Sequence, residues 1–370
     1  MPTTKPTRAI LMTFAAAATA VVVVIFSVVC QTSERNAKPA GAEATPTPAA
    51  EEQQGPVGLG QPTIADLRIK LAYARVGETG TGTLVIHLPN REPADVAGAS
   101  GVFTGISWSP NGQRIAFSVG PTITNQDLYV VAGDGTGVAR LTTDGHSKRP
   151  TWSADGETLA FVSYVPGATP GPGAITLMPA SGGAPRQLTA ELADNPSWSP
   201  DGASIAVSRE PGVVTLISPT DGFETKRIVL LNDSVSKPST SSFVWNGDGS
   251  ALTGVLRKGQ ALAVFTLADE LTAQRQVGTA FLGNPVDTAW PHPSWAAGTA
   301  VLVVASPLTG QLFALSAEAP SKAGPSADPD SLVVVLLDPP LGTKLAYPAV
   351  SPVATGGGAS SSVKYVPATR

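Results

Sequence analysis

One short phrase, a tryptophan followed closely by an Asp-Gly or Asn-Gly pair and then an apolar run, recurs along most of this chain. Its clearest copy is Ser197–Val207, which reads SWSPDGASIAV. Asp-Gly and Asn-Gly tolerate positive φ and reverse the chain in a tight hairpin. The apolar run is too short for a helix and is typical of a buried strand. Each copy therefore predicts two strands joined by a tight turn, with the tryptophan on the first strand, where its ring can pack against a neighbouring unit.

The spacing of the copies predicts how they are arranged. Five of the six tryptophans occupy the same place in the phrase, and neighbouring ones lie 44 to 50 residues apart. A strand-rich repeat with a period in the forties is typical of a β-propeller, in which each blade is a sheet of four strands. The five repeat tryptophans are Trp108, Trp152, Trp198, Trp245 and Trp295.

The phrase and the strand after it resemble the repeats of TolB-type β-propellers, which also occur in the propeller domains of some prolyl-peptidase-like enzymes. The resemblance covers residues 64–370, and the repeats lack the Gly-His and Trp-Asp pairs of WD-type propellers. It implies an all-β propeller fold. Through TolB it also implies an interaction platform in the cell envelope, although a fold by itself does not determine function.

The two ends of this region predict how the ring closes. Residues 69–74 and 83–88 have the pattern of second and third strands, but no first strand precedes them. Residues 344–352 match the repeat, with Val350 in the tryptophan position, so the carboxy-terminal strand is expected to complete the first blade and to remove an open sheet edge. This gives six blades. Residues 362–366 also have the pattern of a second strand, which leaves an extra edge strand or seven blades as alternatives.

The first 63 residues have a different character. Residues 1–8 carry Lys5 and Arg8, and residues 9–29 form an uncharged apolar run long enough to span a bilayer. The positive flank predicts a transmembrane anchor with residues 1–8 in the cytoplasm, and a cleaved signal peptide is the alternative. Residues 30–63 are predicted to be a flexible Pro/Ala-rich linker. Cys30 is predicted to be an ordinary thiol at the membrane edge, and the alternative is lipidation, although Val29 stands where a lipidation motif has a small residue.

The composition and the motifs narrow the function. A net charge of −4 provides no basic field for nucleic acid, and a single cysteine excludes an intrachain disulfide. The sequence contains no G-x-S-x-G nucleophile elbow, phosphate-binding loop, dinucleotide fingerprint or H-E-x-x-H zinc motif. We therefore expect no catalytic residues, metal or cofactor. The repeat acids Asp155, Asp201 and Asp248 are explained by the hairpin turns, in which an Asp side chain bonds the backbone.

The residues just before each repeat tryptophan are better site candidates. The first strand of each blade lines the centre of a propeller, so its start lies at one mouth of the central channel. The positions three and four residues before the tryptophan differ from blade to blade. They predict a small-ligand, ion or peptide site, with loop variation around a water-filled channel as the alternative. The candidates are Lys148, Arg149, Asp194, Asn195, Ser242, His292 and Tyr347.

Together these patterns predict a membrane-anchored, extracytoplasmic propeller that binds an envelope protein or a small ligand. The alternative is a propeller enzyme, a hydrolase or lyase that acts on sugars or peptides at the channel mouth. A glycosidase would need paired carboxylates there.

Overall fold

All the regular elements that the computed structural model describes are β-strands. In the described part of the chain, no helix has the length and apolar composition needed to cross a membrane. The predicted anchor and linker, Cys30 and His292 lie outside the described residues. The described residues are 69–164, 172–210, 213–229, 240–256, 261–266, 274–276, 293–295, 301–306, 310–316 and 333–351.

The described strands form one sheet of seven strands and four sheets of four strands, all antiparallel between neighbours. The first sheet has the order β23 (Thr343–Val350), β1 (Leu71–Gly77), β2 (Gly82–His87), β3 (Ala94–Trp108), β4 (Arg114–Thr122), β5 (Asn125–Ala132) and β6 (Ala139–Arg140). The next two are β7 (Ser147–Trp152), β8 (Thr158–Ser163), β9 (Ala174–Pro179), β10 (Arg186–Gln187), and β11 (Asp194–Trp198), β12 (Ile205–Ser208), β13 (Val213–Ile217), β14 (Glu224–Val229). The last two are β15 (Thr240–Trp245), β16 (Ala251–Leu256), β17 (Ala261–Thr266), β18 (Gln274–Gln276), and β19 (Ser294–Trp295), β20 (Val301–Ala305), β21 (Leu312–Ser316), β22 (Val333–Leu337).

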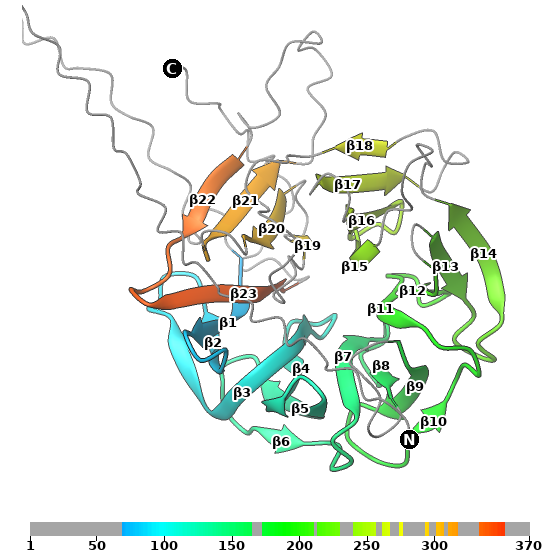
Figure 1. Cartoon of the computed structure of the whole chain (residues 1–370), viewed down its shortest axis with the longest axis horizontal. Helices are drawn as coiled ribbons and strands as arrows, with labels where there is room; N and C mark the ends of the chain where they lie inside the picture. Colours follow the sequence, from blue (N-terminus) through cyan, green and yellow to red (C-terminus); the bar gives the residue numbers. More distant parts are fainter. Residues whose placement is uncertain are drawn as a thin grey trace, which may run out of the picture. The chain divides into compact units, whose positions relative to one another are not determined.

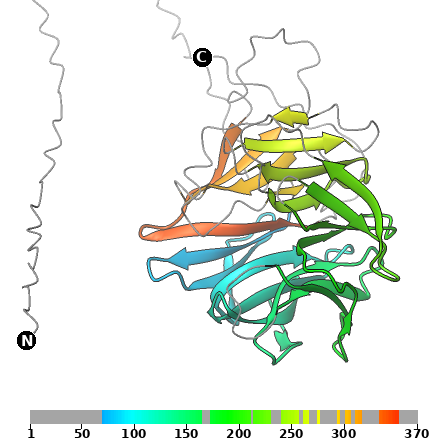
Figure 2. The same cartoon turned by 45° about the vertical axis from the view of Figure 1, so that its right-hand side comes forward.

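The sheets are arranged around a centre, with one strand of each repeat innermost (Figures 1 and 2). The innermost strands contact one another in a closed circuit, β3 to β7, β11, β15, β19, β23 and back to β3. We call them the inner strands. The long strand β3 belongs to two four-stranded units, because Gly101 pairs with β2 whereas Val102 pairs with β4. The predicted propeller arrangement is therefore confirmed.

The chain closes on itself through its two ends. Strand β23 pairs antiparallel with β1, and Val350 lies opposite Leu71. This pairing confirms that the carboxy-terminal repeat supplies the strand missing before residue 69. It also covers an edge of β1 that would otherwise expose unpaired backbone groups. The competing segment, residues 362–366, lies outside the described residues.

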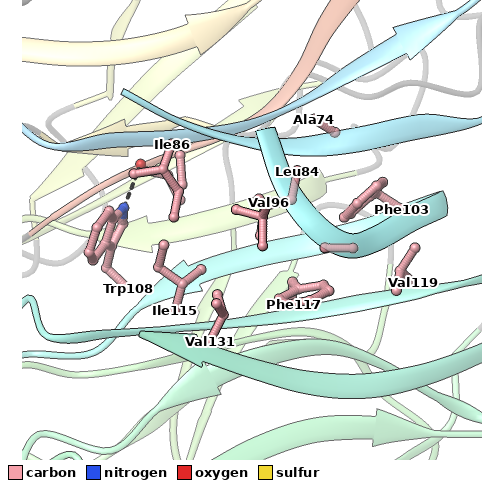
Figure 3. Close-up of a cluster of buried hydrophobic side chains, with 13 residues drawn as sticks. Ala74, Leu84, Ile86, Val96, Phe103, Trp108, Ile115, Phe117, Val119 and Val131 are labelled. Atoms are coloured by element: carbon pink, nitrogen blue, oxygen red, sulfur yellow. Dashed lines mark hydrogen bonds between the residues drawn. The ribbon is translucent and has the colours of Figure 1, made fainter. Parts of the chain in front are cut away.

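The hydrophobic core lies between neighbouring sheets. Successive side chains of a strand point to opposite faces. On β4, Ile115 and Phe117 pack toward the part of the seven-stranded sheet that β1 and β2 form, whereas Ala116 packs against Trp152 of the next sheet. Figure 3 shows the first of these clusters, in which side chains of β1, β2, β3, β4 and β5 meet. Both faces of these strands are buried, which explains why the apolar runs are continuous and not alternating.

The repeated Ser-x-Asp-Gly turn is held by its own side chains. Ser199 Oγ donates to Asp201 Oδ1 at 2.6 Å, and Ser204 N donates to Ser199 Oγ at 2.9 Å. Gly202 has φ of +73°, which a residue with a side chain rarely adopts. The bond from Ser199, together with one from the backbone of Ala203, lowers the pKa of Asp201. Equivalent bonds from Ser153 and Glu157 lower the pKa of Asp155, and the hydroxyl and backbone N–H of Ser250 lower that of Asp248, so the turn explanation of the repeat acids is confirmed.

Most of the repeat tryptophans whose hydrogen bonds are described tie their four-stranded unit to the preceding unit. Trp108 Nε1 donates to Ala349 O at 3.0 Å, the dashed bond of Figure 3. The acceptor is the carbonyl of the residue just before the tryptophan position of the preceding inner strand. Equivalent bonds of 3.0 Å join Trp152 to Ser107 and Trp245 to Ser197.

Trp198 departs from this pattern. Its ring is only partly buried, and Nε1 donates to Gly202 O in its own turn at 3.4 Å. Residues 197–207 are the clearest copy of the repeat in the sequence, and they form the expected turn. The repeat motif therefore predicts the turn but not the acceptor of the indole N–H.

Candidate functional site

The candidate residues three positions before each tryptophan share an unusual backbone. Arg149, Asn195 and Tyr347 have φ of +56°, +51° and +52°, in the left-handed region. Each interrupts the pairing of its inner strand with a bulge, as between Lys148 and Thr151. A bulge turns a side chain away from the regular strand surface, and such conformations often occur at functional sites.

A sequence signal for these bulges precedes the tryptophans and was missed. Each of the three left-handed residues is followed by a proline: Arg149-Pro150, Asn195-Pro196 and Tyr347-Pro348. Proline has no backbone N–H to give to the ladder, so within a sheet it is found at edges and bulges. The X-Pro pair two residues before the tryptophan position therefore predicts the bulge.

The inner strands lie very close together at this level. Gly105 occupies the equivalent position on β3, and a Cβ atom built on it would lie 3.0 Å from Arg149 Cα. Arg149 N also donates to Ser118 Oγ on β4 at 3.1 Å. The start of β7 is thus held against the preceding sheet, and the backbone that carries Arg149 has little freedom to move.

An ion pair joins two neighbouring inner strands. The Arg149 guanidinium on β7 pairs with the Asp194 carboxylate on β11, and each side chain is about one-fifth exposed, at 21% and 20%. The other oxygen of Asp194 accepts the N–H of Asn195 at 2.9 Å. The structure therefore brings together three residues that the sequence predicted as neighbours around the ring.

Lys148 is a buried cation beside this pair, with 4% of its surface exposed. Its ammonium lies 5.2 Å from the ring centre of Tyr164, within cation–π range. Burial lowers the pKa of Lys148, the negative charge of Asp194 opposes that shift, and Arg149 adds to it. Tyr164, at the end of β8, was not predicted as a site residue, and its sequence surroundings give no sign of this role.

Tyr347 completes the cluster from β23. Burial raises the pKa of its hydroxyl by more than the positive charge of Arg149 lowers it. The hydroxyl therefore stays protonated at neutral pH. We call these residues the central cluster: Lys148, Arg149, Asp194, Asn195 and Tyr347. Ser242 lies on β15, but its side chain is outside the described part of the structure, as is the whole of His292.

Exposed apolar side chains surround the same end of the ring. In antiparallel blades, the starts of the inner strands share one face with the β4–β5 turn and with the connections into β11 and β23. Gly173 and Ala193 exchange two backbone hydrogen bonds, which joins the start of β9 to the connection before β11. Ile123, Leu192 and Leu341 are exposed on this face, whereas Phe223 is exposed at the opposite end, in the β13–β14 turn.

Among the described residues, the side chains that usually bind metal ions do not gather into a site. No group of three His, Cys, Asp or Glu side chains lies close enough among them to hold an ion. What the central cluster offers is two cations, one carboxylate, an amide and a phenol, which are suited to polar recognition.

A closed circuit of antiparallel sheets around inner first strands defines a β-propeller. The family of β-propellers to which the chain belongs follows from comparison with known protein families. The TolB beta propeller domain matches residues 59–247, about half of the chain, and the chain belongs to this family.

One solved structure supports that fold, and a second was compared with the chain. The crystal structure of TolB from Acinetobacter baumannii superposes with a TM-score of 0.59 at 17% identity, over 76% of this chain and 66% of that one. The structure of putative TolB from Agrobacterium tumefaciens gives a TM-score of 0.45 at 18% identity, over 68% of this chain and 80% of that one. The chain spans just under two thirds of the first of these.

One curated protein is similar in sequence over a shorter stretch. It is the "Uncharacterized peptidase YuxL" of Bacillus subtilis (strain 168), 29% identical over 154 residues. The match takes in 40% of this chain and only 22% of that protein.

Proposed function

We propose that this chain is a membrane-anchored, extracytoplasmic interaction module that binds a protein partner at the face carrying the central cluster. The observation that carries the proposal is the set of non-repeating polar side chains held in left-handed bulges at equivalent positions of three inner strands. The residues that build the framework of a propeller are similar from blade to blade, whereas the residues at these candidate positions differ between blades. The exposed Ile123, Leu192 and Leu341 on the same face favour a protein over a small molecule, because exposed apolar side chains around a polar centre are typical of protein interfaces.

We further propose that the ring has six blades. The circuit of inner strands from β3 through β23 supports this number, with the seven-stranded sheet contributing two units that share β3. The anchor rests on the sequence alone: the apolar run 9–29 follows Lys5 and Arg8, and residues 30–63 would separate the propeller from the membrane.

The enzymatic alternative receives less support. The peptidase-named relative shares with this chain a stretch that is 22% of its own length, and its name describes the whole protein. Among the described residues, the carboxylate placed in the central cluster is that of Asp194, and a glycosidase mechanism requires a pair.

Crosslinking in membranes tests the proposed function. The full-length chain would be crosslinked in its native membranes and purified, and the captured proteins would be identified and quantified. We expect one partner in a fixed ratio to the bait. Leu192→Asp and Leu341→Asp should each reduce its capture severalfold, because they place a charge at the proposed interface.

Phe223→Asp is the matched control, since it makes the same kind of change on the opposite end of the ring. It should leave capture unchanged. Equal losses from all three substitutions, or no protein captured in a fixed ratio, would contradict a protein-binding role for this face.

A further inference from the structure

The chain contains two Asn-Gly pairs, and the structure holds them differently. They are Asn111–Gly112, in the turn after β3, and Asn246–Gly247, in the turn after β15. Asparagine is a thermolabile residue, and a following glycine leaves its side-chain amide open to attack because glycine has no side chain to hinder the approach. The two pairs therefore place the same chemistry in two different surroundings.

The chemistry is spontaneous deamidation. The backbone nitrogen of the glycine attacks the side-chain carbonyl carbon of the asparagine and loses its proton, the amide nitrogen leaves as ammonia, and a succinimide ring forms. Water then opens the ring at either carbonyl and leaves aspartate or isoaspartate. The reaction consumes only water, but it requires a glycine peptide unit that is free to turn toward the asparagine side chain.

Gly112 is held on both sides. It is buried, its N–H donates to Ser109 O at 2.8 Å, and its carbonyl oxygen accepts from Lys70 Nζ at 3.2 Å. The side chain before it is also engaged, because Asn111 Oδ1 accepts from Ser109 Oγ at 2.8 Å and from Gln113 N at 3.0 Å. Attack on Asn111 therefore requires the bonds of the glycine to open first.

Gly247 is free by comparison. It is exposed, it has no hydrogen bond to any described residue, and a Cβ atom built on it would meet no heavy atom within 4 Å beyond its chain neighbours. The side chain of Asn246 is engaged much like that of Asn111, since Oδ1 accepts from Ala251 N at 2.8 Å and Nδ2 donates to Ser250 Oγ at 3.0 Å. The difference between the two pairs therefore lies in the glycine.

Comparison of the repeats shows why this turn is unusual. At the position of Gly247, the other three Asp-Gly or Asn-Gly turns that follow a repeat tryptophan have Pro110, Ala154 and Pro200. Proline has no backbone N–H with which to attack. The residue before it in those turns is a serine, which has no amide, whereas here it is Asn246. This turn alone among the four has both the amide and the unhindered attacking group in sequence.

We propose that Asn246 is a deamidation site, converted by water to aspartate or isoaspartate, while Asn111 is protected by the fold. The proposal goes beyond the proposed function and does not depend on it. In isoaspartate the main chain runs through the former side-chain carbonyl, so the turn loses the side-chain bonds to Ala251 and Ser250. The modified turn directly follows Trp245, whose indole N–H joins two units.

Rates of deamidation in the folded and the unfolded chain test the proposal. The full-length protein in detergent would be incubated in mildly alkaline buffer at body temperature, beside a sample unfolded in guanidinium chloride. Peptide mass spectrometry would follow the loss of the amide at each asparagine. In the folded protein we expect Asn246 to react about tenfold faster than Asn111 or more, because Asn111 must wait for the bonds of Gly112 to open. In the unfolded sample the two rates should approach each other.

Gly247→Pro is the matched variant. It places at this position the residue that two other turns have, removes the attacking N–H, and costs no described hydrogen bond. It should abolish the reaction at Asn246 and leave the rate at Asn111 unchanged.

Three results would overturn the proposal. They are equal or faster loss of the amide at Asn111 in the folded protein, the same ratio of rates in the unfolded protein, or a reaction at Asn246 that persists in Gly247→Pro. The first two need only the wild-type chain, so they decide the proposal whether or not the variant folds.

Discussion

Replacing Trp152 with phenylalanine tests the idea that the indoles hold neighbouring sheets together. Trp152 is 4% exposed, packs against Ala116 and donates its N–H to Ser107 O at 3.0 Å. The substitution removes the donor, leaves a carbonyl without this partner at a cost of about 1 kcal/mol, and creates a small cavity worth about 1–2 kcal/mol more. We therefore expect Trp152→Phe to lower the free energy of unfolding by about 2–3 kcal/mol.

Trp198→Phe provides the matched comparison, because its ring is only partly buried and its N–H bonds Gly202 within the same turn. We expect a loss of about 1 kcal/mol, since no bond between sheets is broken and less apolar surface is affected. Urea unfolding of the full-length protein, followed by far-ultraviolet circular dichroism, avoids the change in tryptophan fluorescence and gives both values if the transitions are two-state. Equal losses at the two positions would refute the reasoning.

Three further outcomes follow from the structure. Burial raises the pKa of Tyr73 to about 12 from its ordinary value of 10.0. Between these two pH values the folded state keeps a proton that the unfolded state releases. The free energy of unfolding should therefore fall by about 2–3 kcal/mol as the pH rises from 10 to 12. Tyr73→Phe should remove that part of the alkaline loss in urea titrations at several pH values, and an unchanged slope would contradict it. Asn195→Ala should be about 1 kcal/mol less stable than Asn195→Gly, because φ of +51° is unfavourable for a residue with a Cβ atom, and equal unfolding midpoints would argue against the bulge. Removal of residues 339–370 deletes β23 and should yield insoluble or protease-sensitive protein, whereas removal of 352–370 keeps β23 and should preserve the melting temperature. A soluble, cooperatively melting product of the longer truncation would contradict closure by β23.

Much of the fold could be predicted from the sequence because its determinants are local and repeated. The Asp-Gly turns, the apolar runs after them and the tryptophan period predicted the hairpins, and Val350 in the tryptophan position predicted the closing strand. Some boundaries were less accurate. The sequence pattern of residues 138–142 indicates an outer strand of five residues, whereas β6 covers only Ala139–Arg140, because an outer strand has one neighbour and few buried side chains to define its ends.

The candidate site was predicted in position but not in detail. Aligning the repeats was enough to place Arg149, Asn195 and Tyr347 at equivalent points of the ring. Nothing in the alignment indicated that Tyr164 lies under Lys148 or that Ser118 accepts the N–H of Arg149. Those partners come from second strands, whose side chains reach the site only after the sheets have stacked.

The sequence alone therefore determined the repeating hairpins, their order and the strand that joins the two ends, since each depends on residues within one repeat or on simple periodicity. Tertiary structure decided which charges meet. Arg149 and Asp194 belong to neighbouring repeats and have no sequence relationship that predicts an ion pair. Their pairing, the burial of Lys148 and the different bond of Trp198 arise because the inner strands crowd together at the centre, where the spacing between blades, and not the spacing along the chain, sets the contacts.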